Sequence, residues 1–422
     1  MRKIACFALA AMLWVSCAKK EATVQPEATA TAQKSVFATS TITKVQPMTG
    51  IVFWDTSPHN TSDAISLEYS YMLYNDIVKQ KGIYDWSKVE QKLNQIASRG
   101  HQAILRFRFT YPGYQTSVPD YIKAMSNYNE TTAQVWGEQT YYPDWSNTAL
   151  KNFVLEFYEK YAARYDQDKR LAFVQLGFGH YAEYHTYPTP VQLGKTFPDK
   201  VFQTRFFEHL DRVFEHTPWS ISIDAASDTY SPLSANPFLL NINFGLFDDS
   251  FMHKEHSDYN ENSWNFFNRQ RYFTAPAGGE FSYYSDYDQQ NVLKPNGAYG
   301  ESYESYAARF HITYMIGNDQ PDYHAMERIK AASMASGYKF EVTSLSTEAC
   351  VTTIKARNNG VAPLYYDAYF SIGGNRATTL LKGLLPGEEK TFTITHHSDD
   401  NTLAIVCDRL LPGQEIQYKK DF

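Results

Sequence analysis

The fold is decided by two stretches of sequence, Leu171-Ala-Phe-Val-Gln-Leu-Gly-Phe-Gly-His-Tyr-Ala-Glu183-Tyr-His185 and Tyr272-Phe-Thr-Ala-Pro-Ala-Gly-Gly-Glu280-Phe-Ser-Tyr-Tyr284. Each is an apolar run that passes through glycines and aromatic residues and reaches a glutamate. Such a run predicts a buried strand that gives way to a loop. In a (β/α)8 TIM barrel the carboxyl ends of all strands meet at one face, so Glu183 and Glu280 would lie together there.

The rest of this region alternates strand-like and helix-like segments, which favours an α/β barrel over residues 48–336. A doubly wound open sheet is the alternative, but no glycine-rich phosphate turn follows the first strand. Helices are expected at 85–100, 149–165, 201–214 and 323–335. Strands are expected at 50–55, 65–73, 102–109, 220–224, 238–244 and 310–316, together with the two quoted runs.

The pattern changes after Gly337. Short strand-like runs cover 338–356, 362–372, 390–395 and 403–406, and glycine- or proline-containing turns separate them. No segment of useful length with helical periodicity remains. Residues 337–422 are therefore predicted to form a small C-terminal β-sandwich.

The N-terminus indicates export. Arg2 and Lys3 precede an apolar run, 4–15, that is too short to span a bilayer. The run ends in Trp14-Val-Ser-Cys17, which resembles a bacterial lipobox and implies cleavage before Cys17 and lipid on its thiol. Residues 1–17 are thus expected to be a lipoprotein signal peptide, and the protein a lipid-anchored component of the bacterial cell envelope. The alternative is an ordinary signal peptide with a chance cysteine.

Composition narrows the classes of partner. Residues 18–47 are mostly small and polar, and are predicted to be a flexible tether. A net charge of -7 without a basic run argues against nucleic acid. There is no second long apolar segment, so contact with the membrane is expected through the anchor only. Cys350 and Cys407 are either a disulfide or two free thiols.

The order of elements and motifs resembles the bacterial family called domain of unknown function 4832, with its partner region 4874. The resemblance implies a glycosidase-like barrel followed by a β-sandwich. The motifs that carry it are Arg106-Phe-Arg108, Gly177 to His185, Phe247-Asp-Asp249, Gly278-Gly-Glu280, His311, Gly337-Tyr338 and Asn358-Asn-Gly-Val-Ala-Pro363.

The architecture also resembles glycoside hydrolase clan A, in which the acid/base glutamate closes the fourth strand and the nucleophile closes the seventh. The resemblance implies that Glu183 is the acid/base and Glu280 the nucleophile. The chain departs from the clan at Ala182, where the clan has an asparagine that binds the sugar. Tyr181 and Tyr184 beside Glu183 would desolvate an acid and keep it protonated.

Two arginines alternate at the end of the third strand, so Arg106 and Arg108 are both expected to point into the barrel mouth. Either one would reach Glu280 and favour its ionised form. The alternative is a structural ion pair between arginine and glutamate inside the barrel.

Other polar and aromatic residues are candidates for binding substrate. His180 and His185 flank Glu183, but their spacing does not fit the helical metal-binding pattern, and no metal is expected. Asp248 and Asp249, after the expected sixth strand, either bind sugar hydroxyls or cap the next element. The remaining candidates are His311, expected on the eighth strand, the stacking platforms Trp54, Tyr111, Trp136, Trp145 and Tyr283, and more weakly Asp224.

These observations together predict a retaining glycoside hydrolase that acts on a poly- or oligosaccharide with two glutamates and no cofactor. A non-catalytic glycan-binding lipoprotein on a barrel scaffold and a polysaccharide lyase are the alternatives. No Gly-x-Ser-x-Gly elbow, P-loop or Cys-x-x-Cys occurs where it would matter, which disfavours serine hydrolases, nucleotide enzymes and redox enzymes.

Overall fold

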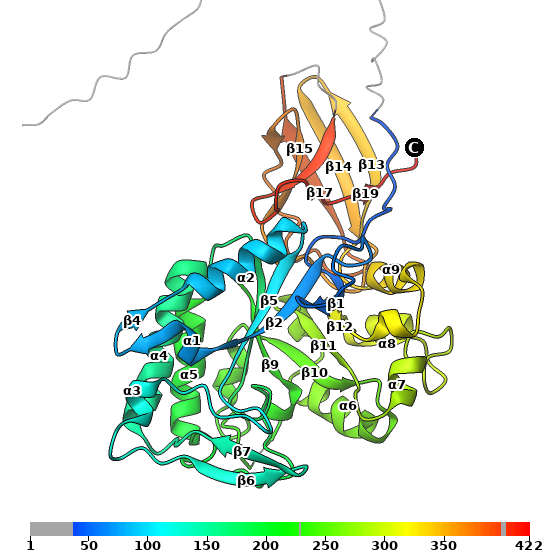
Figure 1. Cartoon of the computed structure of the whole chain (residues 1–422). Coiled ribbons are helices and arrows are strands. Elements are labelled where there is room, and N and C mark those ends of the chain that lie inside the picture. The colour runs from blue at the N-terminus through cyan, green and yellow to red at the C-terminus, as the bar shows by residue number, and fades with distance from the viewer. Residues whose placement is uncertain (1–36, 228, 398–401) are drawn as a thin grey trace, which may run out of the picture. The chain divides into compact units, whose positions relative to one another are not determined.

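The computed structural model describes residues 37–227, 229–397 and 402–422; the expected signal peptide and Cys17 lie outside these residues. Eight parallel strands close into a barrel in the order β1-β12-β11-β10-β9-β8-β5-β2, which confirms the predicted fold class (Figure 1). The barrel strands are β1 (Gly50–Trp54), β2 (Leu67–Leu73), β5 (Gln102–Arg108), β8 (Leu171–Leu176), β9 (Trp219–Ser222), β10 (Gly245–Phe251), β11 (Ala277–Phe281) and β12 (Tyr314–Ile316).

Two of the predicted strands are wrong. Residues 238–244 are apolar, but Pro237 begins a 3-10 helix, Pro237–Asn241, and the sixth barrel strand is β10. The Asp248-Asp249 pair therefore lies within the strand and does not follow it. The run 310–316 divides between the end of a helix and β12, since His311 adopts a left-handed conformation (φ 56°) and ends that helix.

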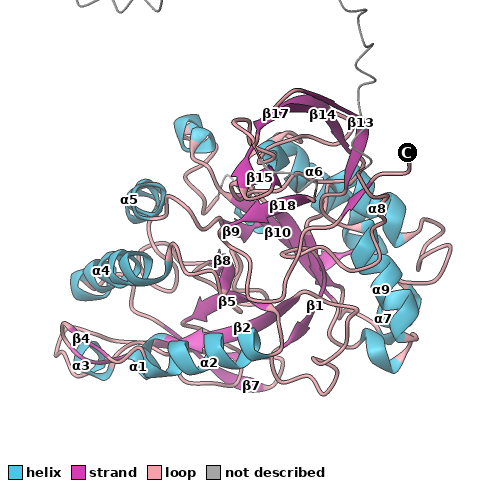
Figure 2. Ribbon diagram, turned by 90° about the horizontal axis from the view of Figure 1, so that it is seen from above, coloured by secondary structure: helices cyan, strands magenta, loops and turns pink. Residues whose placement is uncertain are grey.

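Helices surround the barrel (Figure 2). The helix α2 shows why: Val89, Leu93 and Ile96 recur at helical spacing and are all buried. Within the residues described here, no helix is long and apolar enough to cross a membrane. The helices are α1 (Tyr74–Ile77), α2 (Ser87–Ser98), α3 (Asp120–Lys123), α4 (Thr148–Tyr165), α5 (Lys200–Val213), α6 (Ser257–Phe266), α7 (Asp286–Asn291), α8 (Tyr303–Phe310) and α9 (Met326–Ala335).

Two hairpins, β3 (Val78–Gln80) with β4 (Ile83–Tyr84) and β6 (Thr131–Val135) with β7 (Glu138–Tyr142), extend the loops of the barrel. The second hairpin lies between β5 and α4 in the chain, so it belongs to a connection at the carboxyl end of a barrel strand. Loops at this end are the ones that build barrel active sites.

The C-terminal region is a sandwich of two sheets. One sheet has the order β17-β14-β13-β19 and the other β16-β15-β18, and rings such as Phe370 and Phe392 meet between them. Cys350 is exposed, Cys407 is buried, and both are free thiols. The strands are β13 (Phe340–Glu348), β14 (Val351–Asn358), β15 (Ala368–Ile372), β16 (Asn375–Arg376), β17 (Glu389–Thr395), β18 (Leu403–Cys407) and β19 (Tyr418–Lys419).

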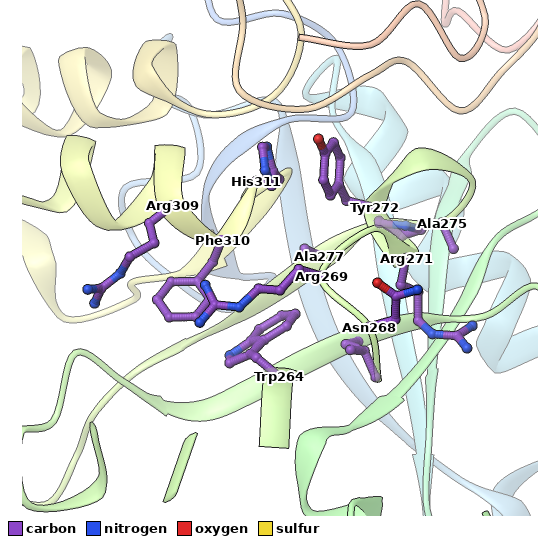
Figure 3. A pocket seen from close by; sticks show the side chains of 12 residues that line it. Trp264, Asn268, Arg269, Arg271, Tyr272, Ala275, Ala277, Arg309, Phe310 and His311 are labelled. Carbon is purple, nitrogen blue, oxygen red and sulfur yellow. The ribbon is translucent and has the colours of Figure 1, made fainter. Parts of the chain in front are cut away.

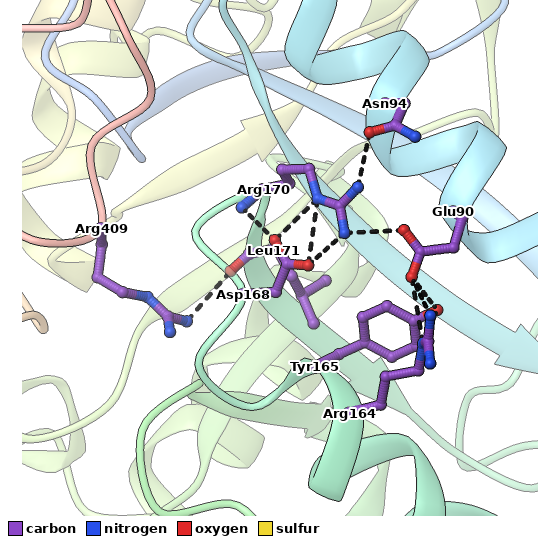
Figure 4. A network of polar contacts seen from close by, with 8 residues as sticks. All are labelled: Glu90, Asn94, Arg164, Tyr165, Asp168, Arg170, Leu171 and Arg409. Atoms are coloured by element: carbon purple, nitrogen blue, oxygen red, sulfur yellow. Dashed lines mark hydrogen bonds and ion pairs between the residues drawn. The ribbon is translucent and has the colours of Figure 1, made fainter.

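The sandwich is joined to the barrel by buried polar contacts. Arg409 donates to the backbone oxygen of Asp166 (3.0 Å) and to Oγ1 of Thr217 (2.7 Å), and its guanidinium lies 4.7 Å from the ring centre of Tyr366. It also reaches the Leu171 carbonyl at the start of β8 (Figure 4). The apolar core of the sandwich is continuous with side chains inside the barrel.

Residues 37–47 correct the predicted extent of the tether. Phe37 is buried, Ser40 pairs with Lys420, and Lys44 Nζ lies 2.8 Å from Glu415 Oε1. Since these contacts hold the segment against the end of the chain, the tether prediction is wrong from Phe37 onward. Residues 18–36 lie outside the part of the chain that the structure describes.

Candidate active site

The loop after β8 folds back tightly and places Glu183. A Cβ on Gly177 would lie 2.1 Å from the Ala182 carbonyl oxygen, and one on Gly179 would lie 2.0 Å from that of His185. The backbone therefore needs glycine at both positions. Tyr181 and Ala182 are both left-handed (φ 56° and 59°), which turns the chain immediately before the glutamate.

Glu183 forms an ion pair with Arg106 inside the barrel mouth. The Nη1 atom of Arg106 lies 2.8 Å from Oε1 of Glu183, and both side chains are almost fully buried. Arg106 Nε donates to Gln175 (2.9 Å), which in turn donates to the Tyr314 hydroxyl (2.8 Å). Since Gln175 lies on β8 and Tyr314 on β12, the network ties Arg106, on β5, to two further strands.

The other oxygen of Glu183 faces His185. Their Nε2 and Oε2 atoms are 3.0 Å apart, and His185 Nε2 lies 3.8 Å from Oδ2 of Asp249. Burial alone would lower the pKa of His185, but the hydrogen bond with Glu183 and the nearby carboxylates raise it to about 9. Burial raises the pKa of Asp249 to about 7, and the charge of Glu183 adds to the rise.

The surroundings of Glu280 favour its protonated form. Burial raises its pKa to about 8; Arg106 opposes this rise, and Glu183 and Asp249 add to it. The hydrogen bonds of Arg106 go to Gln175, the Tyr181 backbone and Glu183, so its charge acts on Glu280 as expected but does not keep that glutamate ionised. Glu183 is buried as expected, but its carboxylate forms the ion pair with Arg106, which the sequence analysis had expected to act on Glu280.

Arg108 lies among aromatic rings. Its guanidinium is 4.4 Å from the ring centre of Tyr111 and 5.7 Å from that of Tyr71. Trp54, at the end of β1, meets Tyr71 edge to face at 5.4 Å. Of the stacking candidates, Trp54 and Tyr111 therefore border the arginines, and so does Tyr71, which the sequence analysis did not select.

Two candidates lie away from the barrel mouth. The carboxylate of Asp248 is buried and accepts hydrogen bonds from Asn260 (3.0 Å) and Trp264 (3.1 Å) on α6, because alternation along β10 turns it outward. It cannot bind sugar in the mouth. Nor does it cap α6, since it bonds side chains in the middle of that helix.

The second misplaced candidate is His311, which lies at the opposite, amino-terminal end of the barrel strands. It stacks on Tyr272 at 3.4 Å, and its Nδ1 lies 2.8 Å from the Val361 carbonyl of the sandwich region. There it lines a pocket with Trp264 and Phe310 (Figure 3). It therefore serves the contact between barrel and sandwich, and its prediction as a residue of the site is wrong.

Some of the remaining candidates are buried side chains, and others are exposed at the surface. His180 is fully buried, with Nε2 2.8 Å from the Tyr142 hydroxyl, and burial lowers its pKa to about 3. Trp145 is also fully buried, so it is core, whereas Trp136 is exposed. Tyr283 is exposed and hydrogen-bonds Asp319 within reach of the charge of Glu280. Asp224 accepts from Tyr259 (3.0 Å), and burial, then the charge of Asp249, raise its pKa.

Further residues of the site have weaker sequence signals. Tyr69 and Tyr71 alternate on β2 beside Arg106, and Tyr71 interacts with the charges of Arg106, Glu183 and Glu280. Their spacing of two, the same as that of the arginines, was a usable signal. Gln175 and Tyr314 carried no such sequence signal, because single polar groups in apolar runs are common.

The same cluster offers donor atoms for a cation. One ligand atom each from Glu183, His185 and Asp249 lies within 4.8 Å of the others. Two carboxylates and an imidazole are a donor set that suits several divalent metals. The positive charge of Arg106 on Glu183 opposes such a cation, as does the raised pKa of His185.

Comparison with known proteins gives no family for this chain. No family model matches it, and no curated protein matches it. Among solved structures, endo-glycoceramidase II from Rhodococcus sp., as its lactosyl-enzyme intermediate, is 11% identical over 84% of this chain and 98% of that one, with a TM-score of 0.41. The α-galactosidase of Thermus thermophilus with p-nitrophenyl α-D-galactopyranoside is 12% identical over 75% and 66%, also at 0.41. Similarity at this level says nothing about activity.

Proposed function

We propose that the protein is a glycoside hydrolase whose catalytic carboxyl groups are Glu183 and Glu280. The observation that supports this most is the contrast between their surroundings. Glu183 is ion-paired with Arg106, whereas burial raises the pKa of Glu280 to about 8. Cleavage of a glycosidic bond needs one carboxylate and one carboxylic acid, and different environments are how enzymes assign the two roles.

The roles follow from these charges. Glu280 donates its proton to the oxygen of the leaving sugar, while Oε2 of Glu183 attacks the anomeric carbon and forms a glycosyl ester. The Glu280 carboxylate then takes a proton from water, which attacks the same carbon and releases Glu183. This assignment is the reverse of the one that the resemblance to clan A implies. Arg106 and His185 orient Glu183 and stabilise it as the leaving carboxylate.

The substrate is a poly- or oligosaccharide. Tyr71, Tyr111 and Tyr283 lie within reach of the charge of Glu280, and Trp54 adjoins Tyr71, so aromatic surface borders the carboxyl groups; Arg108 and Asp249 offer polar contacts to hydroxyls. Together with the lipobox, this suits an enzyme anchored in the cell envelope that meets glycans outside the cytoplasm.

Azide separates the two roles. In a retaining enzyme, azide rescues a variant without its nucleophile and yields a glycosyl azide of inverted configuration. A variant without its acid/base yields the retained configuration. With nitrophenyl glycosides as substrates, Glu183→Gly should therefore give inversion and Glu280→Gly retention, and a fluorosugar inhibitor should label Glu183.

Other outcomes would overturn the proposal. Labelling of Glu280, with the two azide products exchanged, would restore the clan A assignment. Unsaturated products from uronic-acid polymers would identify a lyase instead. Binding of glycans without any cleavage, in the wild type and in both variants alike, would favour the non-catalytic alternative.

A further inference from the structure

Tyr284 presents an exposed ring four residues after Glu280. It is 62% exposed, although two histidine rings contact it. The ring of His253 stacks on it at 4.9 Å with an interplanar angle of 20°, and His256 meets it edge to face at 4.4 Å. No other aromatic ring of the described residues contacts Tyr284. One face of the tyrosine is therefore supported, and the ring remains open to a ligand.

The supporting histidine is itself held by a buried carboxylate. His253 Nδ1 lies 2.6 Å from Oδ2 of Asp288, which is fully buried. Asp288 also accepts hydrogen bonds from Ser282 (2.9 Å) and from the hydroxyl of Tyr299. A ring nitrogen bound in this way fixes the rotation of the imidazole, and so the plane on which Tyr284 rests.

The backbone of Tyr284 is tied to the same carboxylate. Its N–H donates to Oγ of Ser282 (3.1 Å), and that hydroxyl donates to Asp288. Asp288 lies in the first turn of α7, where Ser285 caps the helix. The loops after β10 and β11 are thus joined under the tyrosine, and the ring is preorganised.

The tyrosine lies near three carboxyl groups of the site, one of them the proposed catalytic Glu183. Burial, and then the charges of Asp249, Asp224 and Glu183, raise the pKa of its phenol to about 12. The hydroxyl therefore lies within electrostatic reach of all three carboxylates. A ligand on the open face of Tyr284 would have acceptors for its hydroxyl groups beside it.

We propose that Tyr284 is the floor of a subsite that binds one pyranose ring of the substrate next to the bond that is cleaved. His253 and Asp288 are positioning residues that hold this floor. The inference rests on the proposed function and deepens it. A pyranose presents C–H groups on one face and hydroxyls at its rim, which matches an aromatic surface bordered by carboxylates. A ring that is already ordered loses less entropy when the sugar binds.

The test compares binding and turnover in variants of the whole protein. Tyr284→Ala should weaken binding to an array of immobilised neutral, amino and acidic oligosaccharides about tenfold, with a KM rise of similar size on nitrophenyl glycosides and a smaller change in kcat. Tyr284→Phe keeps the ring and should bind nearly as the wild type. Tyr287→Ala is the control, because Tyr287 is 53% exposed and lies on α7 beside Asp288.

The positioning role has its own readout. Asp288→Asn alone should weaken glycan binding. Added to Tyr284→Ala it should cause no further loss of binding, because the ring that Asp288 positions is then absent. Thermal unfolding of each variant separates misfolding from lost binding. Additive losses in the double variant would overturn the positioning role of Asp288.

Failure of this inference and failure of the proposed function are distinguishable. Unchanged binding and KM in folded Tyr284→Ala overturn the subsite while leaving a hydrolase intact. Binding that depends on Tyr284, without any cleavage, supports the subsite and overturns the hydrolase. A wild type that binds no glycan on the array overturns the subsite.

Discussion

Arg106 and Glu183 form a buried ion pair, with Nη1 2.8 Å from Oε1 and side-chain exposures of 2% and 3%. The pair joins β5 to the loop after β8, and Gln175 and Tyr314 support it from the interior. It determines which glutamate carries a fixed positive partner. The proposed division of labour between Glu183 and Glu280 depends on this one contact.

Removal of Arg106 should destabilise the protein strongly. Arg106→Met leaves the buried carboxylate of Glu183 without its arginine partner, and loss of one partner of a buried pair costs about 3–5 kcal/mol in free energy of unfolding. Urea unfolding of the wild type and the variant measures this loss. Arg106→Met combined with Glu183→Gln should recover much of it, since no unpaired arginine or carboxylate remains. An equal loss in the single and double variants would contradict the ion pair as the cause.

Glu280 should make stability depend on pH. Its folded pKa of about 8 lies above the unfolded value of about 4.3, so its contribution is full below the unfolded pKa and is lost as pH rises through 8. Glu280→Gln removes this dependence. The Tm of the variant minus that of the wild type should therefore be more positive near pH 8.5 than near pH 5. A difference that is constant across this range would contradict the raised pKa.

Most of the barrel could be predicted from sequence, because apolar runs and helical periodicity mark buried strands and helices directly. The sixth strand could not. Residues 238–244 are more apolar than β10, which contains Asp248 and Asp249. Only the closed barrel shows that the carboxylate of Asp248 points outward and bonds Trp264 and Asn260, whereas that of Asp249 faces the mouth. His311 was misplaced because one apolar run contains both the end of α8 and the start of β12.

The residues of the site could be predicted from the sequence better than the contacts between them. That Glu183 follows the fourth strand and Glu280 lies at the end of the seventh could be predicted from their runs. Which glutamate Arg106 reaches depends on the neighbours of β5 in the closed sheet, and β8 is adjacent whereas β11 is not. The support of Tyr284 joins residues 253, 284 and 288 from two loops and a helix, for which no sequence period exists.

The contact between barrel and sandwich should contribute to stability through Arg409. Arg409→Met leaves the buried Asp166 carbonyl and the Thr217 hydroxyl without this donor, which costs about 1–3 kcal/mol. Arg376→Met is the control, because its partner Asp408 is 80% exposed and a surface pair is worth about 0–1 kcal/mol. Equal midpoints of urea unfolding for both variants would contradict the role of Arg409.

Cys17 should carry the membrane anchor, since it is the thiol at the expected cleavage site. Cys17→Ser is expected to move the exported protein from the membrane fraction to the soluble fraction. Cys6→Ser, within the apolar run, should leave it at the membrane. Immunoblots of fractionated cells measure both. A wild type that is already in the soluble fraction after export would rule out the anchor.

Removal of divalent metals should leave the protein unchanged, although Glu183, His185 and Asp249 place donor atoms within 4.8 Å of one another. A metal would need His185 in its neutral form. Burial lowers the pKa of His185, but the hydrogen bond with Glu183 and the nearby carboxylates outweigh burial and raise this pKa to about 9. Arg106 also already holds one oxygen of Glu183. Turnover of nitrophenyl glycosides and Tm should therefore be the same with and without EDTA at neutral pH. A fall in both with EDTA that Zn²⁺ or Mn²⁺ reverses in the wild type, and not in His185→Gln, would show that the cluster holds a metal instead of the proposed ion-paired carboxylate.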